Sequence, residues 1–210
     1  MLAAFVCTFL ARGEGRAYNR GIAMRFACTA LSLFLLAAPF AAGAPITFTA
    51  NLTGLESGSP GTGFTTVIFD PVAHTLNVAV TFSGLISTTT AAHIHCCTTV
   101  PDTGTAAVAT QQPAFGGFPL GVTSGSYNGT FDTLNLATYN PAFVTGHGGT
   151  AASAEAALSS AMLANETYLN IHTMVNPGGE ISGFLHAPEP GTMAMGAIAL
   201  AALWTRRRRR

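Results

Sequence analysis

The chain has 210 residues, 49% of them hydrophobic, and its nine basic and nine acidic residues give a formal net charge of zero. All nine basic residues are arginines, and all lie before residue 26 or after residue 205. Residues 44–187 carry seven acidic residues and no basic one, which excludes nucleic-acid binding and makes recognition of small anions unexpected there.

The first part of the chain has the pattern of an export signal. Residues 24–43 combine one positive charge, Arg25, with an apolar run and small residues at the end, as in a secretory signal peptide. Ala41 and Gly43 predict cleavage after Gly43. Residues 1–23 hold three more arginines and a second apolar start. They are either a long first region of the signal or the product of a gene start placed too early, and we favour the second interpretation.

Residues 44–187 are long enough for one domain with its own core. Apolar and polar residues alternate most clearly over 46–52 and 76–82, a period that predicts β-strands. Turns are expected at 70–74 and 176–179, where proline and glycine occur. Further short strands are predicted over residues 63–69, 91–95, 125–132, 168–173 and 180–185.

Only one helix is predicted, over residues 153–163, with Ser153 as its N-cap. Residues 98–122 and 139–150 are rich in glycine, threonine and proline and are expected to be loops. Many short alternating strands separated by turns predict an all-β domain, a single antiparallel β-sandwich with one short helix. A signal helix is expected before the domain, and a membrane helix after it.

The sequence HIHCC at residues 93–97 is the densest chemical feature of this domain. In a strand, His93 and His95 project to one face, and the residue between them projects to the core. Asn170 and His172 share a face of a second predicted strand in the same way.

Two imidazoles at this spacing can bind one copper or zinc ion, and a third ligand from another strand would complete the site. Candidates for that third ligand are His172, His147 and a thiolate of Cys96 or Cys97. The alternative is structural: the histidines are half-buried polar groups that join strand edges to loops through hydrogen bonds. The sequence leaves both interpretations open.

Three interpretations apply to the adjacent pair Cys96 and Cys97. In an oxidising compartment a vicinal disulfide is expected, and we favour it. As thiolates they would offer soft ligands to copper(I) or zinc, and pairing between chains is the third interpretation. His74, in a turn, and His186, in a linker, are expected to be solvated, whereas Glu180 is expected to anchor a loop.

Residues 91–95, 168–173 and 176–183, in this order, resemble the CHRD domain over about residues 46–185. The cysteine pair stands where that family usually has a glycine, and Ser182 stands where it usually has a basic residue. The resemblance implies an immunoglobulin-like β-sandwich in an extracellular setting, with no established reaction. The His-x-His strand is also similar to that of copper-zinc superoxide dismutases. Dismutase activity is not expected, because no positive residue of the domain would steer the superoxide anion.

The last residues predict sorting at a membrane. Prolines make the step at 188–190 stiff and extended, and an uncharged apolar run at 192–204 precedes terminal arginines that stay on the cytoplasmic side. This order resembles the PEP-CTERM sorting signal, which an exosortase processes. The apolar run is shorter than the roughly 20 residues of a stable span, which favours a transient anchor over a permanent one. The predicted sorting residues are Pro188, Glu189, Pro190, Arg206, Arg207, Arg208, Arg209 and Arg210.

Together these features predict an exported protein, anchored transiently in the inner membrane and then placed at the cell surface or released. The expected partners are the export machinery, an exosortase and extracellular polysaccharide. The first interpretation is a structural or adhesive module of the envelope or biofilm matrix, without enzymatic activity. The alternative is a small copper- or zinc-binding or redox domain that uses His93, His95, Cys96, Cys97 and His172.

Overall fold

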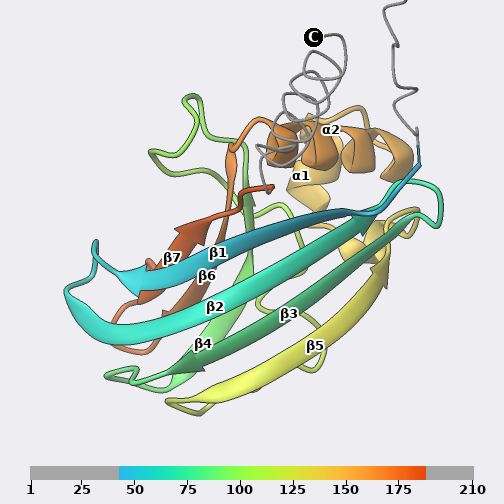
Figure 1. Cartoon of the computed structure of the whole chain (residues 1–210). Coiled ribbons are helices and arrows are strands. Elements are labelled where there is room, and N and C mark those ends of the chain that lie inside the picture. Colours follow the sequence, from blue (N-terminus) through green and yellow to red (C-terminus); the bar gives the residue numbers. More distant parts are fainter. Residues whose placement is uncertain (1–42, 188–210) are drawn as a thin grey trace, which may run out of the picture. The chain divides into compact units, whose positions relative to one another are not determined.

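The computed structural model describes residues 43–187 and contains seven antiparallel strands (Figure 1). Hydrogen bonds join them into one sheet in the order β4-β6-β7-β1-β2-β3-β5, which confirms the all-β antiparallel class. Residues 24–42 of the predicted signal peptide and the predicted sorting segment at 188–210 lie outside the described residues. The strands are β1 Ile46–Gly54, β2 Ser59–Asp70, β3 Thr75–Ser83, β4 Thr89–Cys96, β5 Gly125–Asp132, β6 Thr167–Thr173 and β7 Ile181–Phe184.

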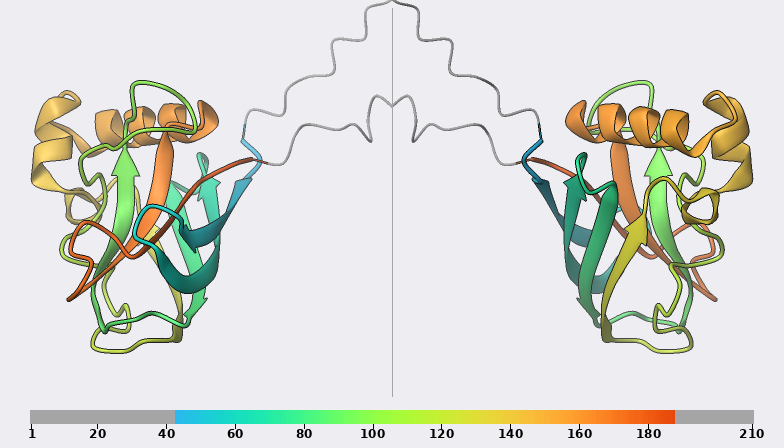
Figure 2. Two further views of the ribbon diagram at one scale, coloured as in Figure 1. Left: turned by 90° about the vertical axis from the view of Figure 1, so that its left-hand side faces the viewer. Right: turned by 90° about the vertical axis from the view of Figure 1, so that its right-hand side faces the viewer.

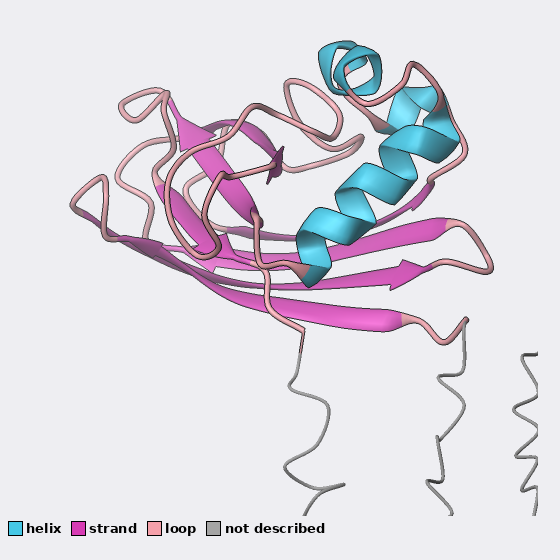
Figure 3. Cartoon of the chain, turned by 90° about the horizontal axis from the view of Figure 1, so that it is seen from above, coloured by secondary structure: helices cyan, strands magenta, loops and turns pink. Residues whose placement is uncertain are grey.

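The sheet is strongly curled, so that β4, β6 and β7 lie on one side of the core and the other four strands lie on the opposite side (Figures 1 and 3). The two sides are joined by a narrow contact in which Thr53 of β1 pairs with Ser182 of β7. Gly183 permits this contact, because a Cβ atom there would lie 2.3 Å from the Asn51 carbonyl oxygen. The expected sandwich of two separate sheets is not confirmed, since the hydrogen bonds continue from one side to the other.

Side-chain alternation explains both the strands and the core. In β1 and β3 the apolar residues at every second position are buried inside the curl, among them Phe48, Leu52, Leu76 and Val78. Their polar neighbours point outward, as the period of two predicts. Strand β6 differs, because all seven of its residues are buried and so both of its faces are covered.

Helices α1 (Pro141–Gly146) and α2 (Ala151–Leu163) lie at one end of the curled sheet, after a short 3-10 turn at Leu136–Thr138 (Figure 2). The prediction of Ser153 as N-cap was wrong. Thr150 is the N-cap, and Ser153 is the third helical residue, which completes a capping box with it. The prediction of loop throughout 139–150 was also wrong, because Asn140 caps α1 and Pro141 starts it. No helix within residues 43–187 is long and apolar enough to cross a membrane.

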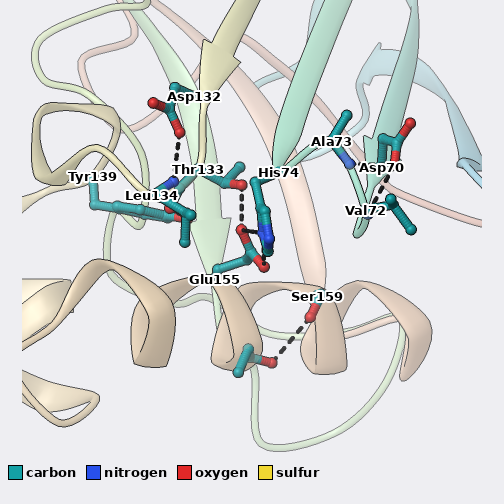
Figure 4. Close-up of polar contacts among 11 residues, drawn as sticks. Asp70, Val72, Ala73, His74, Asp132, Thr133, Leu134, Tyr139, Glu155 and Ser159 are labelled. Carbon is teal, nitrogen blue, oxygen red and sulfur yellow. Dashed lines mark hydrogen bonds and ion pairs between the residues drawn. The ribbon is translucent and has the colours of Figure 1, made fainter. Parts of the chain in front are cut away.

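A partly buried polar contact holds α2 against the sheet (Figure 4). The Glu155 carboxylate of α2 accepts hydrogen bonds from the Thr133 hydroxyl and from Nδ1 of His74, the latter at 3.0 Å. The prediction that His74 is solvated is therefore confirmed only in part. Its imidazole remains 41% exposed, but it links the β2–β3 turn to the helix.

Candidate metal centre

The pairing of β4 with β6 brings the three histidines to one place. His93 lies opposite Asn170 in the ladder, and His172 lies opposite the residue two positions before His93. Because alternate residues of these strands, such as Ile94 and Ile171, enter the core, the histidines project from the opposite face of the sheet. Residues 106–113 and the β6–β7 turn cover that face, and the three histidines are only 5–8% exposed.

Each imidazole is oriented by a backbone carbonyl group. The Nδ1 atoms of His93, His95 and His172 lie 3.0, 2.8 and 2.8 Å from the carbonyl oxygens of Pro113, Ala106 and Pro177. A carbonyl oxygen only accepts hydrogen bonds, so Nδ1 carries the proton and donates it in all three. The neutral ring then has a free lone pair on Nε2.

The free nitrogens converge. Nε2 of His93 and Nε2 of His172 are 2.9 Å apart, and one ring nitrogen from each of the three histidines lies within 4.8 Å of the others. Nε2 of His95 is buried without a hydrogen-bond partner, while the face of its ring stacks on Tyr168 at a centroid distance of 4.6 Å. Two lone pairs at 2.9 Å repel each other unless a proton or a metal ion lies between them.

The surroundings of the three histidines disfavour a proton between the two Nε2 atoms. Burial, together with the neighbouring charges of His172 and His95, lowers the pKa of His93 to about 4, although the hydrogen bond to Pro113 opposes this. Burial also lowers the pKa of His95 and of His172. At neutral pH the group therefore consists of three neutral imidazoles, the form that binds metal ions.

Three imidazole nitrogens are a donor set suited to zinc or copper. With zinc–nitrogen bonds of about 2.0 Å, the nitrogens of a tetrahedral site lie roughly 3.3 Å apart, so the closest pair needs to open by only a few tenths of an ångström. The carbonyl groups that accept hydrogen bonds from Nδ1 set the tautomer and the direction of each ring. Metal-bound histidines commonly have such hydrogen-bond partners on the nitrogen that does not bind the metal. The residues present thus fit a three-histidine metal centre.

Other predicted ligands are not part of this group. Cys96 and Cys97 are joined in a disulfide, and Cys96 packs in the hydrophobic core on the face away from the histidines. His147 lies at the end of α1, where its Nδ1 donates to the Phe143 carbonyl oxygen at 2.8 Å. Among the described residues, the cluster of metal-binding side chains consists of the three histidines alone.

The predicted anchoring role of Glu180 is confirmed nearby. Its carboxylate is 1% exposed and accepts hydrogen bonds from the hydroxyl groups of Ser59 and Thr173 and from the Ile86 N–H, at 2.6, 2.7 and 2.6 Å. Burial raises the pKa of Glu180, but these hydrogen bonds outweigh it, so the pKa lies below its ordinary value. The charge holds β2, β6 and the loop between β3 and β4 together next to the turn that orients His172.

The carbonyl groups of Ala106 and Pro113 are functional groups that the sequence did not indicate. They belong to the predicted loop 98–122, whose path depends on the sheet beneath it. Pro177 lies in a predicted turn, but nothing local in the sequence shows that its carbonyl group meets His172.

Two comparisons with known families bear on this geometry. The family described as CHRD domain matches residues 48–185, which include the three histidines and all of the strands except the first two residues of β1. The PEP-CTERM protein-sorting motif matches residues 186–210. No curated protein and no solved structure matches the chain.

Proposed function

The chain belongs to the CHRD domain family and carries a PEP-CTERM sorting motif, and from this premise we propose that its domain binds a copper or zinc ion in the cell envelope. The ligands are Nε2 of His93, His95 and His172. The sorting motif implies export and processing by an exosortase. Transient anchoring in the inner membrane through residues 192–204 is part of the proposal.

The observation that carries the proposal is the convergence of three unprotonated nitrogens, two of them 2.9 Å apart. A purely structural role would be expected to pair each Nε2 with a donor, because a buried polar atom without a partner costs about 1–3 kcal/mol. His95 Nε2 has no such partner. A metal ion would satisfy all three lone pairs at once.

The charge of the domain supports the same proposal. Residues 44–187 contain seven acidic and no basic residues, so cations are attracted to the domain rather than repelled. The predicted compartment also matters, since an exported protein meets metal ions without the competing thiols of the cytoplasm.

Elemental analysis of the exported protein tests the centre. After incubation with copper and zinc and removal of loosely bound ions, the wild type is expected to retain one ion per chain. The double variant His93→Ala/His95→Ala and the single variant His172→Gln are expected to lose it. His147→Gln is the matched control, because that imidazole lies outside the group. Substoichiometric metal in the folded wild type, or equal loss in the control, would overturn the proposal.

The sorting step has its own test. We expect the intact mass of the envelope-associated protein to exclude the terminal arginines, since processing removes the segment that carries them. A mass that still includes Arg206 to Arg210 would contradict processing.

A groove on the outer face of β2, β3 and β5 supports the adhesive function as a second candidate. It has a volume of about 350 Å³ and is lined by Phe64, Tyr127, Thr66, Thr81 and Asn128, among others. The exposed ring of Phe64 lies there beside hydroxyl and amide groups, a combination that suits an uncharged sugar chain. Phe64→Ser is expected to reduce cosedimentation with envelope polysaccharide, whereas Val72→Ser, at a more exposed apolar site in a turn outside the groove, is not. Equal binding by both variants would count against this candidate.

A further inference from the structure

A pocket lies directly against the three histidines. It has a volume of about 440 Å³, and His93, His95 and His172 form part of its wall. The rest of the lining comes from β4, from the loop that follows it and from the β6–β7 turn, and consists of Thr90, Ala91, Val108, Gln112, Pro113 and Pro177. None of these six side chains is charged.

The protein supplies three donors where the metals in question commonly take four ligands. Among residues 43–187, no carboxylate, thiolate or further imidazole belongs to the cluster. Zinc sites with three protein ligands keep the fourth position for water or substrate, whereas structural sites are closed by a fourth side chain. The pocket provides the space for that fourth ligand.

The charge balance defines the chemistry of the ligand. Three neutral imidazoles leave a divalent ion with its full charge of about +2, and no side chain of the pocket neutralises it. Partial exclusion of water strengthens the attraction of this charge for an anion. The amide group of Gln112 can donate a hydrogen bond to such an anion.

We propose that the metal ion keeps one exchangeable position that faces this pocket and binds small inorganic anions. This inference rests on the metal centre proposed above. It also reverses an expectation from the sequence, where the absence of lysine and arginine in residues 44–187 argued against anion recognition. The positive charge would come from the bound ion instead of from a side chain.

Cobalt(II) is the probe, because its visible spectrum reports the ligands of the ion. The exported protein is stripped with a chelator and reloaded with cobalt, and elemental analysis establishes one ion per chain. Titration with azide is expected to change the cobalt spectrum saturably, with one azide bound per ion. His172→Gln is expected to abolish both the cobalt spectrum and the response.

A pair of neighbouring substitutions locates the anion. Gln112→Leu removes the donor from the pocket and is expected to weaken azide binding about fivefold without loss of cobalt. Gln111→Leu is the matched control, since the Gln111 side chain bonds to Gly116 and Ala137 and does not line the pocket. Its azide affinity is expected to equal that of the wild type.

The two proposals fail in different ways. Failure of the folded protein to bind cobalt, copper or zinc would overturn the metal centre, and this inference with it. Cobalt bound at one ion per chain with a spectrum that saturating azide leaves unchanged would overturn the exchangeable position alone. Equal weakening by the two glutamine substitutions would refute the placement of the anion in this pocket.

Discussion

Mild acid is expected to destabilise the metal-free protein, because its buried imidazoles resist protonation. The pKa of His93 is about 4 in the folded protein, against 6.5 for an ordinary histidine. Well above pH 6.5 the imidazole is neutral in both states and contributes no pH dependence. Between pH 6.5 and 4 the unfolded chain takes up a proton that the folded protein does not, so stability falls as the pH falls.

The size of the effect follows from the difference between the two pKa values. For His93 alone it amounts to about 3 kcal/mol by the time the pH has reached 4, at 1.36 kcal/mol per pH unit. That loss is a large part of the 5–15 kcal/mol that typically stabilises a domain. His95 and His172, whose pKa values burial also lowers, act in the same direction. The lowered pKa of Glu180 adds a further loss only in stronger acid, below the ordinary pKa of a glutamate.

Urea unfolding in the presence of a chelator measures this loss at pH values between about 7.5 and 4.5. The comparison is with His93→Gln, whose side chain is polar but does not titrate. We expect the free energy of unfolding to fall by about 2 kcal/mol more in the wild type than in the variant over this range. Parallel pH profiles for the two proteins would refute the argument that His93 is buried and neutral.

Three further predictions concern the scaffold. Glu180→Gln is expected to lower the free energy of unfolding by about 3 kcal/mol in urea titrations, because three donors lose a charged acceptor, whereas the exposed Glu56→Gln changes little. Gly183→Ala places a methyl group against a β1 carbonyl oxygen and is expected to cost about 2 kcal/mol, measured in the same way. Gly178→Ala, with open space at its Cβ position, is the control, and an equal loss there would contradict the close approach. Replacement of both cysteines by serine is expected to leave metal stoichiometry in elemental analysis unchanged, since Cys96 faces the core; loss of the ion from the folded variant would contradict this.

The elements that the sequence predicted best are those whose pattern is local. Strands β1 and β3 alternate apolar and polar residues over most of their length, and both lie where they were expected. Strand β2 begins at Ser59, four residues before the predicted start, because Ser59 pairs with Gly54 of β1 beyond a register shift that leaves Pro60 and Gly61 without a β1 partner. Helix α1 has only six residues, too few for a helical period, although the Asn140–Pro141 step carried a start signal.

The candidate site also combines features that follow from a local pattern with features that depend on tertiary structure. The placement of His93 and His95 on one face follows from their spacing in a strand, so the sequence determined it without further information. Only tertiary structure decided that His172, and not His147 or the cysteines, joins them, because this depends on the pairing of β4 with β6 across about 80 residues of chain.

The sequence by itself determined the C-terminal sorting motif, the acidic and lysine-free character of the domain, its strand-rich class and the family to which it belongs. These are properties of composition and of short-range order, which persist whatever the rest of the chain does. The direction of each imidazole, the protonation of its Nδ1 and the pocket beside it were decided by folding alone. They depend on backbone carbonyl groups from distant loops. Every residue carries the same carbonyl group, so the sequence does not show which of them meets an imidazole.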